Sequence, residues 1–167
     1  MSAPFPGGKR AMATVCKGPW TPNQIEAFLQ QAVYPMRLAC VATDGYPRVV
    51  SRWFRYEQDM LYCVSHRESS LVALLRRNER VGFEIAPNEP PYHGVRGQGT
   101  ATLQALGDDD TLRVLLQRFL GGVDSKLARW LLSRSDEEML ISIQPQRWFS
   151  WDYRERMEDT GTRGSAG

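Results

Sequence analysis

The sequence has few of the residues that build metal sites or disulfide frameworks. Its 167 residues include three cysteines, Cys16, Cys40 and Cys63, and two histidines, His66 and His93. An odd number of cysteines without C-x-x-C spacing indicates neither a disulfide framework nor a zinc site. We therefore predict no bound metal and reduced cysteines, as in the cytoplasm.

Lysines and long apolar runs are also scarce. Three of the 21 basic residues are lysines, and the net charge is only +2, which gives no support to nucleic-acid binding. No apolar run approaches the ~18 residues that would span a bilayer, so no membrane partner is expected. The N-terminal segment lacks the apolar block of a secretory signal.

Motifs for a serine nucleophile or a dinucleotide site are absent as well. None of the serines lies in a G-x-S-x-G context, and the glycines of residues 94–99 are not in G-x-G-x-x-G order. These absences argue against a Ser-His-Asp hydrolase and exclude a Rossmann phosphate loop.

What the sequence does contain is a series of short strands joined by turns. Thr21, Pro22 and Gln24 form a helix start with a capping box, and Asp44-Gly45 is a strong hairpin signal. Further helices are predicted over 69–77, 108–119 and 124–132. The predicted strands cover 36–42, 48–56, 60–64, 81–86, 95–106, and 139–143 with 148–153, where Pro145 interrupts.

This pattern favours a mainly β fold: six antiparallel strands in a small barrel with short helices. We place the barrel domain at 19–153, between a flexible N-terminal arm over 1–18 and a flexible C-terminal tail over 154–167. Small residues on one face of the strand at 95–106 predict close backbone approach. In the strand that starts at Arg48, Arg48 and Arg52 share one face.

A polar loop, Ser65-His66-Arg67-Glu68-Ser69-Ser70, leads from a strand into a helix. The first turn of a helix has unpaired N–H donors and the positive end of its dipole, which can bind phosphate or carboxylate. The same loop contains Ser65-x-x-Glu68, a capping box whose glutamate disfavours a nearby phosphate. Anion binding and simple helix capping therefore both remain open.

Several segments taken together resemble the pyridoxamine 5′-phosphate oxidase-like, flavin-binding split-barrel family. The resemblance covers residues 36–153 and depends on the series rather than on any one piece. Its pieces are the hairpin Met36–Val50, Trp53-Phe54, Leu61-Tyr62, the polar loop, Leu75-Arg76-Arg77-Asn78, Tyr92-His93-Gly94-Val95-Arg96 before Gly99, and Trp148-Phe149-Ser150-Trp151-Asp152.

The resemblance implies a homodimer of split barrels with FMN, or in some branches a deazaflavin or haem, in grooves at the subunit interface. It implies a flavin-dependent oxidoreductase acting on a small molecule, and it identifies no catalytic residue. Carried over to this chain, it implies that the strand Arg48, Val49, Val50 and Ser51 lies along the flavin ring. It implies that the phosphate is faced by Ser65, His66, Ser69 and Ser70. It also implies that Gln98 approaches from the neighbouring barrel wall and that Trp151 or Trp148 packs near the ring or closes the dimer.

One position departs from the family pattern. Members that bind FMN well have a basic pair at the positions that match Ser70 and Leu71, and leucine supplies neither charge nor a donor. Each lost charge-assisted contact is worth ~1.5–3 kcal/mol unless Arg67, Arg52 or Arg48 compensates. A deazaflavin-dependent reductase, a non-enzymatic flavin or haem binder, and a barrel without cofactor therefore remain alternatives.

The same residues also have structural interpretations. Arg48 and Arg52 fit surface ion pairs, His66 a solvated loop residue, and Gln98 an exposed strand residue. Trp148 and Trp151 have opposite strand faces, so at least one is expected in the core or at the dimer contact.

Overall fold

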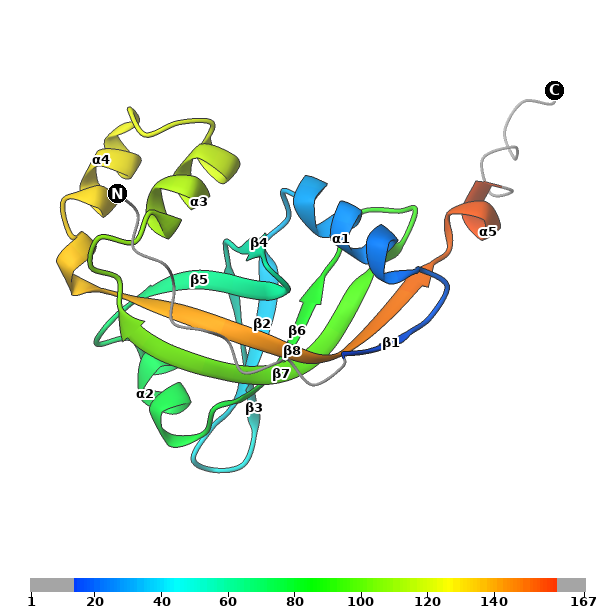
Figure 1. The fold of residues 1–167 in the computed structure, drawn as a ribbon, viewed down its shortest axis with the longest axis horizontal. Coiled ribbons are helices and arrows are strands. Elements are labelled where there is room, and N and C mark those ends of the chain that lie inside the picture. Colours follow the sequence, from blue (N-terminus) through cyan, green and yellow to red (C-terminus); the bar gives the residue numbers. More distant parts are fainter. Residues whose placement is uncertain (1–13, 159–167) are drawn as a thin grey trace, which may run out of the picture.

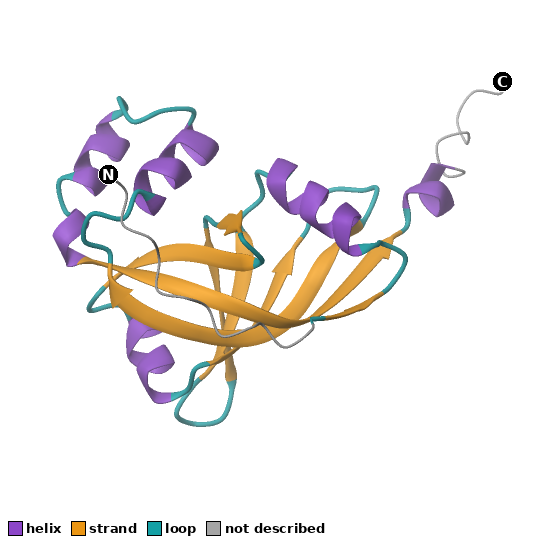
Figure 2. Cartoon of the chain, viewed as in Figure 1, coloured by secondary structure: helices purple, strands orange, loops and turns teal. Residues whose placement is uncertain are grey.

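A computed structural model describes residues 14–158, which form a mainly β, split-barrel domain (Figures 1 and 2). Within these residues eight strands make one sheet, ordered β3-β2-β6-β7-β8-β5-β4, with β1 added parallel to β8 and all other neighbours antiparallel. The strands are β1 Val15–Lys17, β2 Met36–Val41, β3 Pro47–Arg52, β4 Arg55–Glu57, β5 Met60–His66, β6 Arg80–Ile85, β7 His93–Ala105 and β8 Glu138–Asp152.

The described residues also form five α-helices around the sheet. In the view of Figure 1, α3 and α4 lie above β5 at one end, and α2 lies below. No helix in this part of the chain is long and apolar enough to cross a bilayer. The helices are α1 Pro22–Gln31, α2 Ser70–Arg77, α3 Thr111–Leu120, α4 Lys126–Leu132 and α5 Arg154–Glu158.

Most predicted elements are present, including the Thr21–Gln24 capping box, whose two reciprocal hydrogen bonds both form. The strand expected over 48–56 is wrong as a single element, because it breaks at Trp53-Phe54 into β3 and β4. The interruption expected at Pro145 is also wrong. The pairing of β7 with β8 shifts from Gln98↔Arg147 to Gly99↔Pro145, and this bulge lets β8 continue through the proline.

Part of each predicted flexible end lies in a strand or helix of the described residues. Of the predicted arm over 1–18, residues 1–13 lie outside the described residues, and Val15–Lys17 form β1 against β8. Of the predicted tail over 154–167, residues 154–158 form α5 and 159–167 lie outside the described residues.

Hydrogen bonds at the end of β8 connect it to the N-terminal segment. Asp152 accepts hydrogen bonds from the Arg154 guanidinium and from Trp20 Nε1, the latter at 3.0 Å. The Arg154 contact is the main reason that the pKa of Asp152 lies far below its usual range, and the Trp20 contact adds to it.

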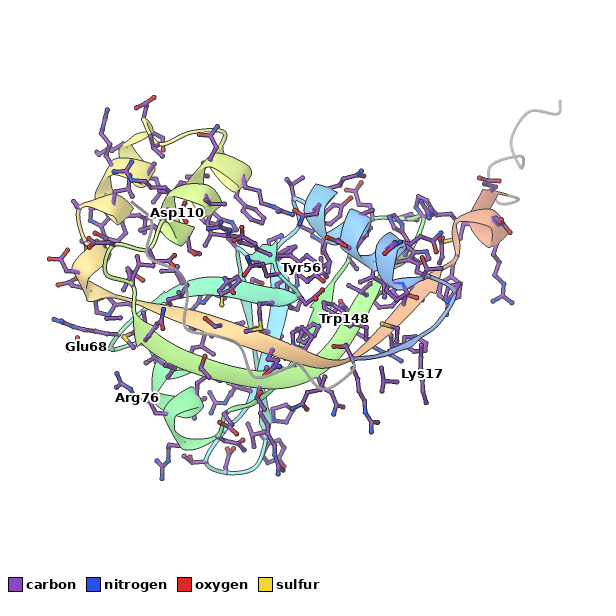
Figure 3. All side chains as sticks on the ribbon, in the orientation of Figure 1. Lys17, Tyr56, Glu68, Arg76, Asp110 and Trp148 are labelled. Atoms are coloured by element: carbon purple, nitrogen blue, oxygen red, sulfur yellow. The ribbon has the colours of Figure 1, made fainter. Side chains whose placement is uncertain are left out.

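The core confirms the expected close approach on β7. A Cβ added to Gly97 would lie 2.3 Å from the Arg147 carbonyl oxygen and 2.6 Å from the ring of Phe83. Phe83 in turn packs edge-to-face on Trp148, at 4.9 Å between ring centroids, and the ring of Tyr56 also packs edge-to-face on Trp148, at 6.3 Å (Figure 3). Trp148 is thus the core tryptophan that the strand alternation called for.

A smaller apolar cluster lies under α3 and α4. Leu112, Leu116 and Ala128 form it with Leu140 of β8. Arg118 of α3 donates hydrogen bonds to the carbonyl oxygens of Leu29 and Ala32 at the end of α1, so it links two helices that are distant in sequence.

Candidate functional site

The polar loop before α2 brings three side chains together, which we call the serine–arginine seat: Arg52, Ser65 and Ser69. Arg52 Nη2 donates to Ser65 Oγ at 3.2 Å, and the hydroxyls of Ser65 and Ser69 are 2.9 Å apart. Ser65 is buried, at 5% exposure. Arg52 Nε is also buried and has no hydrogen-bond partner among the described residues. The seat therefore holds a cation and a donor that lacks an acceptor.

Ser69 is the N-cap of α2, and its Oγ accepts a hydrogen bond from Val72 N at 3.2 Å. The capping box expected at Ser65-x-x-Glu68 is therefore wrong, because the helix begins later and Ser69 caps it. Since α2 starts at the seat, the positive end of its dipole adds to the charge of Arg52. This donor set fits a phosphate.

The two positions of the missing basic pair differ in what they could do. Leu71 is 2% exposed and belongs to the main core cluster. Ser70 is exposed at the first position of α2. A donor for an anion at this helix start could therefore be added at residue 70, but not at residue 71.

His66 belongs to a separate charged group beside the seat. Its Nε2 is 3.3 Å from Glu137 Oε2, which also contacts Arg134 Nη2 at 2.7 Å. The hydrogen bond from Arg134, followed by that from His66, lowers the pKa of Glu137. His66 Nδ1 accepts from Glu68 N–H at 3.2 Å, and Nε2 also lies 3.2 Å from Arg134 Nη2, so His66, Arg134 and Glu137 form one cluster.

The next carboxyl group, Glu138, lies opposite His66 in the pairing of β5 with β8. Burial raises the pKa of Glu138, and His66, Arg134 and Arg52 counteract part of that effect. Sequence reasoning missed Glu137, Glu138 and Arg134, because only the strand register brings residues some 70 positions apart together. The acidic run 136–138 was the one available signal, and it carries no motif.

The remaining candidate residues of β3 divide between two faces. Arg48, Val50 and Arg52 alternate with Val49 and Ser51, which confirms that the two arginines share one face. β3 is an end strand of the sheet path, so within residues 14–158 one of its edges has no neighbouring strand.

Val49 and Gln98 lie in one row on the outer face of the sheet. The row runs through directly opposed residues of neighbouring strands: Val49, Ala39, Gly82, Gln98, Arg147 and Val15. Val49 and Gln98 are three strand spacings apart, about 14 Å. A ligand in contact with both within one protomer would have to span that distance.

The outer face is hollowed at two places that share Gln98. One hollow, of about 660 Å³, lies over Ala39 and Gly82, where side chains are small or absent. The other, of about 230 Å³, is lined by Lys17, Arg96 and Arg147, and its described lining residues include no acid. Lys17 extends from β1 at this end of the sheet (Figure 3), and Arg96 stacks over Phe149 at 4.5 Å.

Trp151 is remote from the seat. It lies opposite Gly94 on β7, whereas Ser65 lies opposite Met139, and residues 139 and 151 are about 40 Å apart along β8. The fold thus groups Ser65 and Ser69 with Arg52. It does not bring Gln98 or Trp151 to the same place within one protomer.

The family follows from a comparison with known sequences. The family model described as pyridoxamine 5′-phosphate oxidase matches residues 21–152, most of the chain. The chain therefore belongs to this family, as the resemblance predicted. No curated protein matches the chain by sequence.

Solved structures agree on the fold. A conserved Mycobacterium tuberculosis protein, Rv2991, is 18% identical, with a TM-score of 0.70 over 95% of this chain and 98% of its own. An F420 reductase is 19% identical, with a TM-score of 0.61 over 77% and 98%. The haem-storage protein HutZ of Vibrio cholerae is 18% identical, with a TM-score of 0.60 over 77% and 92%. At these identities the likeness extends to the fold alone.

Proposed function

We propose that this chain is a flavin-dependent oxidoreductase that acts on a small molecule and holds FMN at the interface of a homodimer. The serine–arginine seat carries the proposal. A partly buried guanidinium, two linked hydroxyls and a helix N-terminus offer a phosphate one charge and several donors. Arg52 thus compensates for the basic pair that Ser70 and Leu71 replace.

The outer face of the sheet supports the dimer. Val49 is 63% exposed, Val41 39% and Phe149 38%, and the larger hollow is lined by Val41 and Gln98. A second copy would cover these apolar side chains. It would also bring Gln98 and Trp151 of one subunit toward the seat of the other, which a single protomer cannot do.

When bound, FMN would supply the electron-transfer chemistry. In this arrangement Arg52, Ser65 and Ser69 hold the phosphate, and the exposed edge of β3 lies along the ring. Cys16, Cys40 and Cys63 are free thiols, and this fits a reducing compartment such as the cytoplasm.

The test is an FMN titration of the purified protein, followed by flavin fluorescence, with sedimentation to establish the oligomeric state. Arg52→Met should weaken FMN binding by about 10- to 150-fold, the loss of one charge-assisted contact of ~1.5–3 kcal/mol. Arg76→Met, on the exposed side of α2 (Figure 3), is the matched control and should bind like the wild type. Failure of the wild-type dimer to bind FMN at high micromolar concentration would refute the proposal.

The basic hollow favours a second candidate, a deazaflavin-dependent reductase. F420 is a deazaflavin with a longer tail than FMN, and Lys17, Arg96 and Arg147 would supply an open basic groove for it. Paired titrations separate the two candidates. Arg96→Gln with Arg147→Gln should weaken F420 and leave FMN unchanged if the tail lies there. A haem binder would instead bind haem and give its absorption spectrum, and a barrel without cofactor would stay colourless with all three.

A further inference from the structure

A cavity of about 250 Å³ opens beside the serine–arginine seat and is not explained by a phosphate. β3, β5 and β8 form one side of it, and α3 and α4 form the other. Its walls are largely apolar, and two charged groups lie among them. The apolar lining side chains include Trp53, Val64, Leu112, Leu115 and Leu131, and the charged ones are Arg52 and Glu138.

Arg52 belongs to both the seat and this cavity. Its Nη2 contacts Ser65, while its Nε keeps a hydrogen without an acceptor. Glu138 faces the same cavity, and no ion pair joins Glu138 to Arg52 among residues 14–158. The guanidinium and the carboxylate therefore line one cavity without pairing with each other. His66 and Arg134 also act on Glu138 electrostatically, but their direct contacts are with Glu137.

The walls are held in place by contacts outside the cavity. Trp53 stacks on Phe119 at 5.6 Å with an angle of 11° between the rings, and Arg118 ties α3 to the end of α1. The cavity is thus built by α3 rather than left by loose packing, because α3 is fixed from two sides.

We propose that this cavity binds a neutral molecule of about one ring, whose polar end both accepts a hydrogen bond from the Arg52 guanidinium and donates one to Glu138. A carboxamide or lactam meets both conditions. A carboxylate would face Glu138 and an ammonium or amidinium would face Arg52, so each would meet a like charge. For scale, a dry cavity of about 150 Å³ accommodates benzene, so this one holds a substituted ring.

The inference goes beyond the proposed function, because the pocket adjoins the phosphate seat and not the edge of β3 along which that function places the flavin ring. It differs from that function in its observable consequences, because the pocket should bind its ligand without any flavin.

Three probes of one size test the pocket: benzamide, benzoate and benzamidine. Each is titrated into the full, cofactor-free protein labelled with ¹⁵N, and the Trp53 indole signal is followed after assignment with Trp53→Phe. In titrations followed by this signal, benzamide should bind with an apparent affinity at least about 10-fold higher than either charged probe. Equal binding of all three, or no shift with benzamide at millimolar concentration, would overturn the inference.

Variants sharpen the result. Glu138→Gln removes the negative charge and adds an amide donor, so benzoate should bind within about 3-fold of benzamide. Leu131→Phe fills the pocket and should abolish benzamide binding. Leu132→Phe is the matched control, since Leu132 neighbours it on α4, is also half-buried and does not line the cavity.

The same protein is titrated with FMN in parallel. If FMN binds and benzamide does not change the Trp53 signal, the pocket is refuted while the flavin function stands. If benzamide binds with the predicted preference and FMN does not, the pocket is supported and the proposed function is refuted.

Discussion

Arg118 offers a sharp test of how the domain is assembled. Its guanidinium donates to the carbonyl oxygens of Leu29 and Ala32, which are among the unpaired carbonyls at the C-terminal end of α1. It also lies over the ring of Phe54, at 4.9 Å from the centroid. Burial lowers the pKa of Arg118, but a guanidinium stays charged at neutral pH, and the two carbonyl oxygens and the ring face that charge.

Arg118→Met removes the donors and leaves two helix-end carbonyls without partners. A hydrogen bond from a charged group is worth ~1.5–3 kcal/mol, and the ring contact adds ~0.5–1 kcal/mol. Because these contributions are not additive, we expect a loss of about 3 kcal/mol in the free energy of unfolding. For a domain of this size the melting temperature should then fall by about 6–12 °C.

The assay is urea unfolding of the wild type, Arg118→Met and Arg118→Lys. The lysine of Arg118→Lys keeps the positive charge but lacks the forked N–H donors of the guanidinium. It should therefore recover about half of the unfolding free energy that Arg118→Met loses. Arg113→Met on the exposed side of the same helix is the control and should stay within about 0.5 kcal/mol of the wild type. An Arg118→Met protein as stable as that control would refute the structural role assigned to Arg118.

Three further predictions follow from single positions. Ser70→Lys places an ammonium at the exposed start of α2 and should tighten FMN binding about 5-fold in fluorescence titrations. A charge-assisted contact of ~1.5–3 kcal/mol outweighs the ~0.3–1 kcal/mol cost of a cation at the positive end of the helix dipole. Unchanged FMN affinity counts against the serine–arginine seat. The depressed pKa of Asp152 means that its contribution to stability is complete above the usual carboxyl pKa and is lost as pH falls toward the folded value. Between pH 5 and pH 2.5, Asp152→Asn should therefore lose less unfolding free energy than the wild type, while the control Glu155→Gln follows the wild type; parallel slopes for all three contradict this. Gly97→Ala should lower stability by ~1–3 kcal/mol in urea unfolding, whereas Gly122→Ala, with open space around it, should be neutral; equal effects would contradict the close packing on β7.

Much of the fold was predictable because it is encoded locally. The alternation of β2, β5 and β6, the Asp44-Gly45 turn and the α1 capping box depend on neighbours in sequence, and all are present. The continuation of β8 through Pro145 was not predictable. It depends on a bulge in its pairing with β7, and a proline in one strand carries no information about the register of another.

The candidate site was predictable only in part. The loop 65–70 and its hydroxyls were readable as an anion seat, but the identity of the helix cap was not, since Ser65 and Ser69 both suit that role. Glu138 and the pocket walls from α3 and α4 escaped notice because long-range packing alone brings them to Arg52. The division of β3 into two faces followed directly from alternation.

The position of β8 has a consequence for how the chain acquires its structure. β8 lies between β7 and β5 in the sheet and also pairs with β1. The sheet therefore cannot be completed until residues 138–152 are available. A nascent chain that ends before residue 138 would expose the edges of β5 and β7, which invite pairing with other molecules. Folding of this domain therefore has to wait until residues 138–152 have been synthesised, and a chain cut before residue 138 should yield aggregates rather than a smaller folded fragment.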